Sequence, residues 1–378
     1  MLGMRERKFL VIKLGSIGDV VHALPAVHQL RAQYPDAVID WLIERKSAPI
    51  IDGNKDISSR IVIDTKRWRR EVFLRPLKVL SEIRQLEGRL RSARYDAAID
   101  LQGLLKSSVL AWLSKSRLRF GFPGRECREP LSARLTNRKC WHVVDVQHVV
   151  EKLCAIVWCV EEELGDVEPL LKPDFCRGAR GSIAVRDGAR REILDFLGAK
   201  GVQKDDLLVG INPCAGWETK RWGGANFTRV IRVLTENGRG RRMRFVLLYG
   251  PGERQYAGEI LQALGRGADG DVFLAPPTDI PQLCALLEAC DVVVSGDTAV
   301  LHIAANLGRP TVALFGPSDP ARNGPFGNPS VVLQHVMACG PCYKRKCRSM
   351  ACIKNISPAR VATAVERLLR EGRTADNE

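Results

Sequence analysis

The chain has 378 residues, of which 45% are hydrophobic and 6% aromatic, and this length allows two globular domains with separate cores. The formal net charge is +15, and residues 60–140 hold 20 Lys and Arg against 8 Asp and Glu. This basic segment predicts an anionic partner. No apolar run reaches the length of a membrane span and no cleavage site follows the N-terminus, so we expect neither a transmembrane helix nor a signal peptide.

Short apolar strands alternate with helical patterns along the first half of the chain. The predicted strands lie at 9–14, 38–43, 61–64 and 95–103, and the predicted helices at 20–35, 77–92 and 104–114. Such alternation with short loops is typical of a parallel sheet that is covered by helices on both faces.

The second half repeats this alternation after a Gly-, Pro- and Arg-rich linker at 171–182. Its predicted strands lie at 207–213, 245–253, 271–277, 291–297 and 311–317. One predicted helix begins near 225, two more follow the strands at 245–253 and 291–297, and the others lie at 283–290 and 357–372. The fold class that follows is α/β, with two Rossmann-like domains and a cleft between their parallel sheets.

Ligands of open parallel sheets bind beyond the carboxyl ends of the strands, where helix N-termini point free amides at anions. After the first strand, Gly15 and Gly18 permit a tight turn and Asp19 stands at a helix start, where it is suited either to an N-cap or to a ligand. After the strand at 207–213, Lys220 and Arg221 follow a small-residue turn and suit a phosphate, although solvated surface charges are equally consistent.

Two further loops carry similar chemistry. Glu253 follows Gly250-Pro-Gly and is suited to bind a ribose or to cap its own helix. Gly296 lets the backbone approach a ligand, Asp297 and Thr298 end the strand, and His302 lies on the same helical face as Thr298, which indicates a phosphate site. None of these loops has the G-x-G-x-x-G spacing of a dinucleotide oxidoreductase.

Together these motifs resemble glycosyltransferase family 9, the ADP-heptose:lipopolysaccharide heptosyltransferases. In chain order they are SIGDVVHALPAV, NPCAGWETKRW, GPGE, SGDTAVLHIAA and LFGPSDP. Five segments, KRWRR, DLQGLLKSS, REPLSAR, NRK and QHVVEK, are similar to type I members, which attach the first heptose to Kdo on lipid A. One departure is Cys214, where the family often has glycine.

The resemblance implies a GT-B fold, with two parallel sheets facing a central cleft, and an inverting, metal-independent transfer without a cofactor. It implies an acceptor domain at 1–175, a nucleotide-sugar domain at 176–355 and a helix at 356–378 that packs back on the first domain. Asp19 would be the catalytic base. The donor residues would be Lys220, Glu253, Gly296, Asp297, Thr298 and His302. The acceptor candidates are Lys66, Arg67, Arg70 and Arg128, with Lys106 as a weaker addition.

The expected partners are ADP-heptose, Kdo-lipid A and the anionic cytoplasmic face of the inner membrane, to which a cytoplasmic enzyme would bind peripherally. A type II or other family 9 transferase remains an alternative. A nucleic-acid-binding protein is disfavoured because the excess of arginines lies in one half of the chain, aromatic residues for stacking are sparse and the sequence has none of the usual binding motifs.

The twelve cysteines suggest the reduced thiols of a cytosolic protein. Four of them, Cys339, Cys342, Cys347 and Cys352, have a spacing that suits zinc or an iron–sulfur cluster, with free thiols or local disulfides as the alternative.

Overall fold

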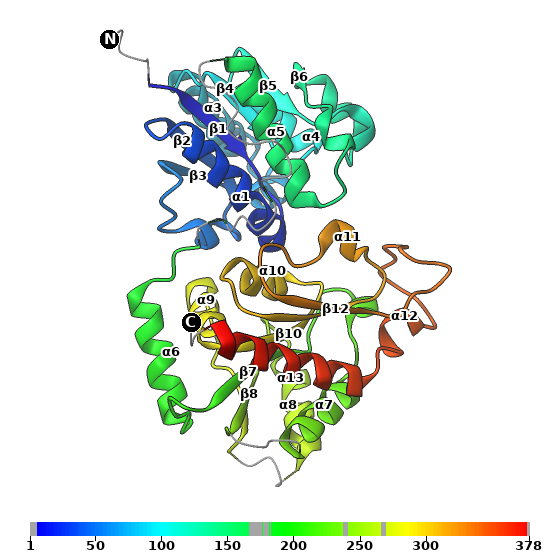
Figure 1. Ribbon diagram of the computed structural model, residues 1–378. Helices are drawn as coiled ribbons and strands as arrows, with labels where there is room; N and C mark the ends of the chain where they lie inside the picture. Colours follow the sequence, from blue (N-terminus) through cyan, green and yellow to red (C-terminus); the bar gives the residue numbers. More distant parts are fainter. Residues whose placement is uncertain are drawn as a thin grey trace. The chain divides into compact units, whose positions relative to one another are not determined.

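The computed structural model divides the chain into two compact units, Met1–Ala184 and Val185–Glu378 (Figure 1). It describes residues 6–165, 176, 181, 183–236, 241–265 and 270–375. The division falls after Ala184, whereas we predicted it after residue 175, and most of the predicted linker at 171–182 lies outside the described residues.

A six-stranded parallel sheet forms the centre of the first unit, in the spatial order β3-β2-β1-β4-β5-β6. Its strands are β1 (Lys8–Ile12), β2 (Val38–Glu44), β3 (Ser59–Ile63), β4 (Ala97–Asp100), β5 (Leu118–Gly121) and β6 (Arg138–Lys139). The strand order reverses between β1 and β4, and a crevice for ligands opens at such a reversal. The loops after these two strands therefore flank the first candidate crevice.

Helices cover both faces of this sheet (Figure 1). They are α1 (Ile17–Gln33), α2 (Thr65–Glu71), α3 (Pro76–Ser92), α4 (Leu105–Leu113) and α5 (Val149–Leu164), with short 3-10 turns η1 (Ala48–Ile51), η2 (Gly124–Glu126), η3 (Pro130–Arg134) and η4 (His142–Val144). Side chains alternate along a strand, so Leu10 and Ile12 share one face of β1, where they form a core with Leu86, Leu90 and Leu110 of α3 and α4.

The second unit repeats the architecture with the order β12-β11-β10-β7-β8-β9, again all parallel. Its strands are β7 (Leu207–Asn212), β8 (Met243–Leu247), β9 (Val272–Leu274), β10 (Val292–Gly296), β11 (Thr311–Phe315) and β12 (Ser330–Gln334). Here the order reverses between β7 and β10, so the loops after these strands flank the second candidate crevice. The two Rossmann-like sheets confirm the predicted α/β class.

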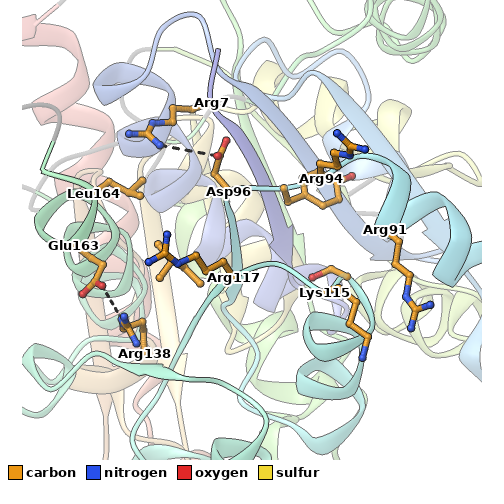
Figure 2. Close-up of a pocket in the computed structure, with 12 residues that line it drawn as sticks. Arg7, Arg91, Arg94, Asp96, Lys115, Arg117, Arg138, Glu163 and Leu164 are labelled. Carbon is orange, nitrogen blue, oxygen red and sulfur yellow. Dashed lines mark hydrogen bonds and ion pairs between the residues drawn. The ribbon is translucent and has the colours of Figure 1, made fainter. Parts of the chain in front are cut away.

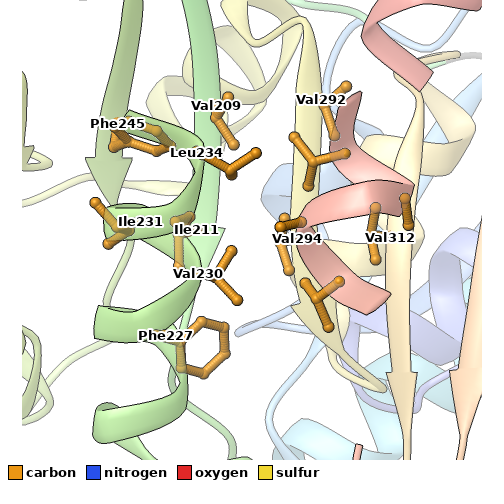
Figure 3. Close-up of a cluster of buried hydrophobic side chains, with 14 of the residues drawn as sticks. Val209, Ile211, Phe227, Val230, Ile231, Leu234, Phe245, Val292, Val294 and Val312 are labelled. Atoms are coloured by element: carbon orange, nitrogen blue, oxygen red, sulfur yellow. The ribbon is translucent and has the colours of Figure 1, made fainter. Parts of the chain in front are cut away.

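The second unit contains helices α6 (Asp187–Ala199), α7 (Gly224–Glu236), α8 (Arg254–Leu264), α9 (Ile280–Ala289), α10 (Ala299–Asn306), α11 (Pro320–Asn323), α12 (Ala351–Lys354) and α13 (Pro358–Ala375), and the 3-10 turn η6 (Glu218–Lys220). Figure 3 shows the main core, in which Phe227, Val230 and Ile231 of α7 pack over the valines of β7 and β10.

The last helix, α13, forms part of the core of the second unit. Val361, Val365 and Leu368 are buried there, beside α7 and strands β10 to β12, and the predicted packing of residues 356–378 on the first unit stays a prediction. The apolar stripe of this amphipathic helix thus covers the sheet of its own unit.

Two disulfides correct the expectation that the cysteines are all free thiols. Cys140 pairs with Cys159, and Cys154 pairs with Cys176. The other eight cysteines are free. Along the described stretches of the chain, no helix combines the length and the apolar character that a bilayer crossing requires.

Candidate functional site

The loop after β1 holds Asp19 on the first turn of α1. Ser16 is the N-cap of this helix and Asp19 is its third residue, which corrects the N-cap interpretation of Asp19. The Asp19 carboxylate accepts hydrogen bonds from the Ser16 backbone N–H at 3.1 Å and from Ser16 Oγ at 3.0 Å. A Cβ atom on Gly15 would lie 2.7 Å from this carboxylate, so a larger residue would displace it. The capping box therefore fixes a half-buried carboxylate at the carboxyl edge of the sheet.

Buried polar groups join this loop to the one after β4. The Gln102 side-chain oxygen accepts a hydrogen bond from the Gly15 N–H at 2.8 Å. Lys13 is buried directly after β1, and its Nζ donates to the Leu101 carbonyl at 2.6 Å. The two loops at the strand reversal thus form one connected surface beside Asp19.

Asp100, at the end of β4, is a buried carboxyl at this edge. Its Oδ1 accepts hydrogen bonds from the N–H groups of Gln102 at 2.9 Å and Gly103 at 3.2 Å, and its Oδ2 accepts one from Ser107 Oγ at 3.0 Å. Burial raises the pKa of Asp100 to about 6, although these hydrogen bonds and the charge of Lys13 oppose the shift. Asp100 therefore orders the turn that presents Gln102, and it titrates close to neutral pH.

We expect the substitution Asp100→Asn to stabilise the folded chain at neutral pH. The folded pKa of about 6 exceeds the ordinary value of 3.8, so the folded state binds the proton more tightly and stability falls as the pH rises between these values. Asn keeps an oxygen for both N–H donors and carries no charge. The free energy of unfolding of the Asp100→Asn variant should exceed that of the wild type by about 1–3 kcal/mol at about pH 8.

Urea unfolding curves at about pH 4 and about pH 8 measure this difference. The difference should be much smaller at about pH 4, where the folded wild-type carboxyl is protonated and the unfolded one is only about half ionised. An advantage of Asn that is the same at both pH values would show that the charge of Asp100 is not its origin.

Glu44, at the end of β2, links that strand to the starts of two helices. Its carboxylate accepts hydrogen bonds from the Thr65 N–H at 3.2 Å and from Thr65 Oγ1, and it lies 3.4 Å from Lys106 Nζ. Helix α2 therefore begins at the carboxyl edge of the sheet. Two predicted acceptor contacts, Lys66 and Arg70, are exposed on this helix.

The other two predicted acceptor contacts differ in their surroundings. The Arg67 guanidinium forms ion pairs with Glu82 and, at 3.7 Å, with Glu71, and this fixes α2 on α3. Arg128 is exposed in the loop between η2 and η3. Arg67 is thus engaged within the unit, whereas Arg128 presents its charge to solvent.

In the second unit, Asp297 lies directly after β10, and its carboxylate contacts three hydrogen-bond donors. Its Oδ2 accepts hydrogen bonds from Lys220 Nζ and Ser318 Oγ, both at 2.6 Å, and its Oδ1 lies 3.2 Å from His302 Nε2. The side chains of Asp297 and His302 are each 6% exposed. The structure therefore brings together three of the residues predicted to bind the sugar donor, Lys220, Asp297 and His302. They come from the loops after β7 and β10 and from α10.

The charge of Asp297 is firmly fixed. Burial alone raises the pKa of this carboxyl, but the hydrogen bond and charge of His302 and the charge of Lys220 outweigh it and hold the pKa well below its usual range. Lys220 Nζ also lies 4.6 Å from the centroid of the Trp217 ring. Asp297 is thus an anion at any working pH, and it orients the ammonium group of Lys220 and the ring of His302.

Thr298 is the N-cap of α10, and its Oγ1 accepts a hydrogen bond from Asn212 Nδ2 at 3.0 Å. Within the described residues, no side chain caps the first amides of α10, so this helix start is suited to an anion. Gly296 lies close to a neighbouring loop. A Cβ atom there would lie 3.1 Å from the Lys220 carbonyl oxygen, so glycine admits the Lys220 loop, and its predicted contact with a ligand stays a prediction.

Glu253, after β8, occupies the N-cap position of α8 and has its own set of contacts. Its Oε2 accepts a hydrogen bond from the Gly250 N–H at 3.0 Å, and its Oε1 lies 3.8 Å from Arg221. Burial, followed by the charge of the nearby Glu253, raises the pKa of the Cys214 thiol to about 12. The cysteine that departs from the family pattern is therefore accommodated as a neutral thiol.

A basic cavity of about 530 Å³ lies at the amino ends of β1, β4, β5 and β6, the opposite edge from Asp19 (Figure 2). Its charged lining residues are Arg7, Arg91, Arg94, Asp96, Lys115, Arg117, Arg138 and Glu163. Helices α3 and α4 end here, and cations are favourable at helix C-termini. Part of the positive charge of residues 60–140 is therefore remote from the candidate site.

Two groups of residues have the side-chain types of a metal site, and neither has a complete set of thiolate or nitrogen ligands. No three of the sulfurs of Cys339, Cys342, Cys347 and Cys352, all of which are described, lie within 4.8 Å of one another. Among the described residues, the group that meets this distance consists of His142, Cys159 and Glu162, but the Cys159 sulfur is bonded to Cys140. A tetrathiolate centre needs all four sulfurs to converge on one ion.

Several residues that hold these edges were not among the predicted site residues. Asp100, Gln102 and Ser318 lie in the segments DLQG and LFGPSDP, directly after predicted strands, and this position was their signal. Lys13 was also missed, and its signal was its place as a lone cation in an apolar run. Glu44 had no signal, because its partners lie 21 and 62 residues away along the chain.

Known proteins share this sequence pattern over most of its length. The sequence model of glycosyltransferase family 9 (heptosyltransferase) matches residues 83–353. This chain belongs to glycosyltransferase family 9. A relative, lipopolysaccharide heptosyltransferase 1 of Pseudomonas aeruginosa, is 28% identical, and the match covers 96% of this chain and 98% of that protein. Lipopolysaccharide heptosyltransferase 2 of Salmonella typhimurium is 27% identical, with 96% and 99% covered.

The architecture agrees with this family assignment. The structure of Escherichia coli heptosyltransferase WaaC with ADP superposes with a TM-score of 0.72 at 24% identity, covering 96% of this chain and 99% of that one. The predicted GT-B class, with two Rossmann-like domains, is confirmed. Family membership makes the chain a heptosyltransferase-type glycosyltransferase, and the two curated relatives are too close in identity to separate type I from type II.

Proposed function

We propose that the chain transfers L-glycero-D-manno-heptose from ADP-heptose to Kdo of the lipopolysaccharide inner core, as type I enzymes do, with inversion at the anomeric carbon. The observation that carries the proposal is the Lys220–Asp297–His302 set, which stands at the start of α10 after a strand reversal. The names of the relatives support a heptose donor and a lipopolysaccharide acceptor, and the ADP complex of WaaC supports an adenine nucleotide.

The second unit would bind the donor. Lys220, His302 and the first amides of α10, next to Thr298, suit the two negative charges of the diphosphate. Glu253 is suited to accept hydrogen bonds from the ribose hydroxyls. Asp297 would position Lys220 and His302 and would not itself approach the phosphates.

The first unit would supply the base. Asp19 takes the proton from an acceptor hydroxyl, and the oxygen forms a bond to the anomeric carbon on the face opposite ADP. The bond from this carbon to the diphosphate oxygen breaks, and the electron pair leaves with ADP. Lys220 and the positive end of α10 stabilise the charge that grows on the leaving group, so the proposed mechanism needs no metal ion and no cofactor.

Exposed cations of the first unit suit the acceptor. Kdo carries a carboxylate and lipid A carries phosphates, which Lys66, Arg70 and Arg128 could bind, Arg in the forked manner that its guanidinium allows. Arg67 would have to release Glu82 to take part. The acceptor is a membrane lipid, so we place the enzyme at the cytoplasmic face of the inner membrane, with no nucleic-acid partner.

The test is release of ADP from ADP-L-glycero-D-manno-heptose in the presence of Kdo-lipid A, or of Kdo-lipid A that already carries one heptose. We expect release with the first acceptor only, and no change on addition of a chelator. Release with the second acceptor only would assign the chain to type II, which the similarity to the Salmonella typhimurium enzyme makes the second candidate. Donor binding without release on either acceptor would overturn the proposed acceptor.

A further inference from the structure

We propose that residues 72–77, which we call the docking tip, bind the surface of an anionic lipid bilayer. The docking tip joins α2 to α3 and exposes three large apolar side chains: Phe73 is 89% exposed, and Leu74 and Leu77 are each 82% exposed. Single exposed apolar residues are common on soluble proteins, but contiguous exposed apolar patches generally mark a binding surface.

The docking tip is built into the fold. The Val72 N–H donates to the Trp68 carbonyl at 2.8 Å, and the Arg75 N–H donates to the Glu71 carbonyl at 2.7 Å, so the turn is hydrogen-bonded. Trp68 Nε1 donates to Glu82 of α3 at 2.7 Å and thereby anchors α2 below the turn. The apolar side chains are therefore presented by an ordered backbone.

Positive charge surrounds the docking tip. Residues 66–78 contain six Lys and Arg and a single acidic residue, Glu71. Arg69, Arg75 and Lys78 flank the apolar side chains and are exposed. In the described parts of the chain, Arg69 and Arg75 form no ion pair with a carboxylate, so their charges are available to a partner.

An apolar tip within a basic collar matches an anionic bilayer. Phe and Leu side chains enter the boundary between headgroups and acyl chains, while Arg and Lys stay among the anionic headgroups. The core of a protein–protein interface is depleted in charged residues, so a lipid surface explains both parts of the patch better than a protein partner does.

The position of the docking tip links bilayer binding to the candidate site. Helix α2 begins at Thr65, which is hydrogen-bonded to Glu44 at the carboxyl end of β2, the edge of the sheet to which the Asp19 loop also belongs. Docking would hold this edge near the membrane in which the acceptor resides. That consequence rests on the proposed function, whereas bilayer binding itself requires neither donor nor acceptor.

The test is co-sedimentation of the full chain with vesicles of phosphatidylcholine alone or mixed with an equal amount of phosphatidylglycerol. We expect binding to the mixed vesicles, weakened by salt. The triple variant Phe73→Ser, Leu74→Ser, Leu77→Ser should bind them about a hundredfold more weakly, as should Arg69→Gln, Arg75→Gln, Lys78→Gln. The matched control is Leu194→Ser with Val336→Ser, which changes exposed apolar residues of the second unit and should bind like the wild type.

Three results would overturn the docking tip: no binding by the wild type, equal binding to both kinds of vesicle, or wild-type binding by the triple serine variant. Loss of self-association in that variant, without vesicle binding by the wild type, would assign the patch to a second copy of the chain instead. Transfer to a soluble, deacylated acceptor separates the two proposals. A chain that binds vesicles but transfers no heptose would refute the proposed function alone, and the reverse would refute the docking tip alone.

Discussion

Replacing Asp19 by Asn should lower the rate of heptose transfer by about 10²- to 10⁴-fold, the usual contribution of a general base, and leave the affinity for ADP-heptose unchanged. Asn retains an oxygen that can accept the hydrogen bonds from the Ser16 N–H and Oγ, but it cannot take a proton from the acceptor. The measurements are ADP release in a single turnover and donor binding by calorimetry.

A matched variant separates this chemical role from the structural one. Ser16→Ala breaks the capping box but keeps the carboxylate, so it should lower the free energy of unfolding by about 0.5–2 kcal/mol and retain most of the turnover. Asp19→Ala should show both losses. If Ser16→Ala and Asp19→Asn reduced turnover equally, Asp19 would act through the helix start and not as a base.

The sequence predicted the sheets better than their edges. Apolar runs correctly indicated β1, β7 and β10, because parallel strands that are buried on both faces read as continuous hydrophobic segments. The interior strand β5 and the edge strands β6 and β12 were not predicted. Strand β6 has two residues, both polar, and so has no periodicity to detect, and β12 contains exposed positions.

The sequence also indicated which loops carry polar chemistry, but it could not assign partners. Ser318 reaches Asp297 across 21 residues and Lys220 reaches it across 77, because three parallel strands end at the same edge. The topology brings these loops together, whereas the direction of each side chain depends on packing that no local pattern records. For the same reason the sequence did not show that Gly296 accommodates the neighbouring Lys220 loop.

The net charge of a segment predicted the positions of its side chains least well. The net positive charge of residues 60–140 predicted an anionic partner, but the fold distributes this charge over opposite edges of the sheet. Arg117 and Lys115 line the cavity at the amino ends of the strands, whereas Lys66 and Arg70 lie on α2, which begins at the carboxyl edge. A sum over a segment contains no information on which helix end or strand end each side chain occupies.

The substitution Lys220→Met should weaken ADP binding by about 10- to 150-fold, the range expected for a charge-assisted hydrogen bond. Met approximates the length of the lysine side chain without its charge, so the loop should keep its packing beside Trp217. Calorimetry with ADP measures the change. The matched control is Lys204→Met, which removes an exposed lysine near the amino end of β7 and should bind ADP like the wild type.

Stability should change with pH in a direction that reports on Asp297. In the wild type, the folded pKa of this carboxyl lies below its ordinary value of 3.8, so the ion pair adds stability at neutral pH, and that contribution disappears as the pH falls below about 4. Lys220→Met removes one of the two groups that lower this pKa. The variant should therefore be destabilised most at neutral pH and approach the wild type in acid. Weakened ADP binding with a pH-independent loss of stability would mean that Lys220 contacts the nucleotide but does not stabilise the charge of Asp297.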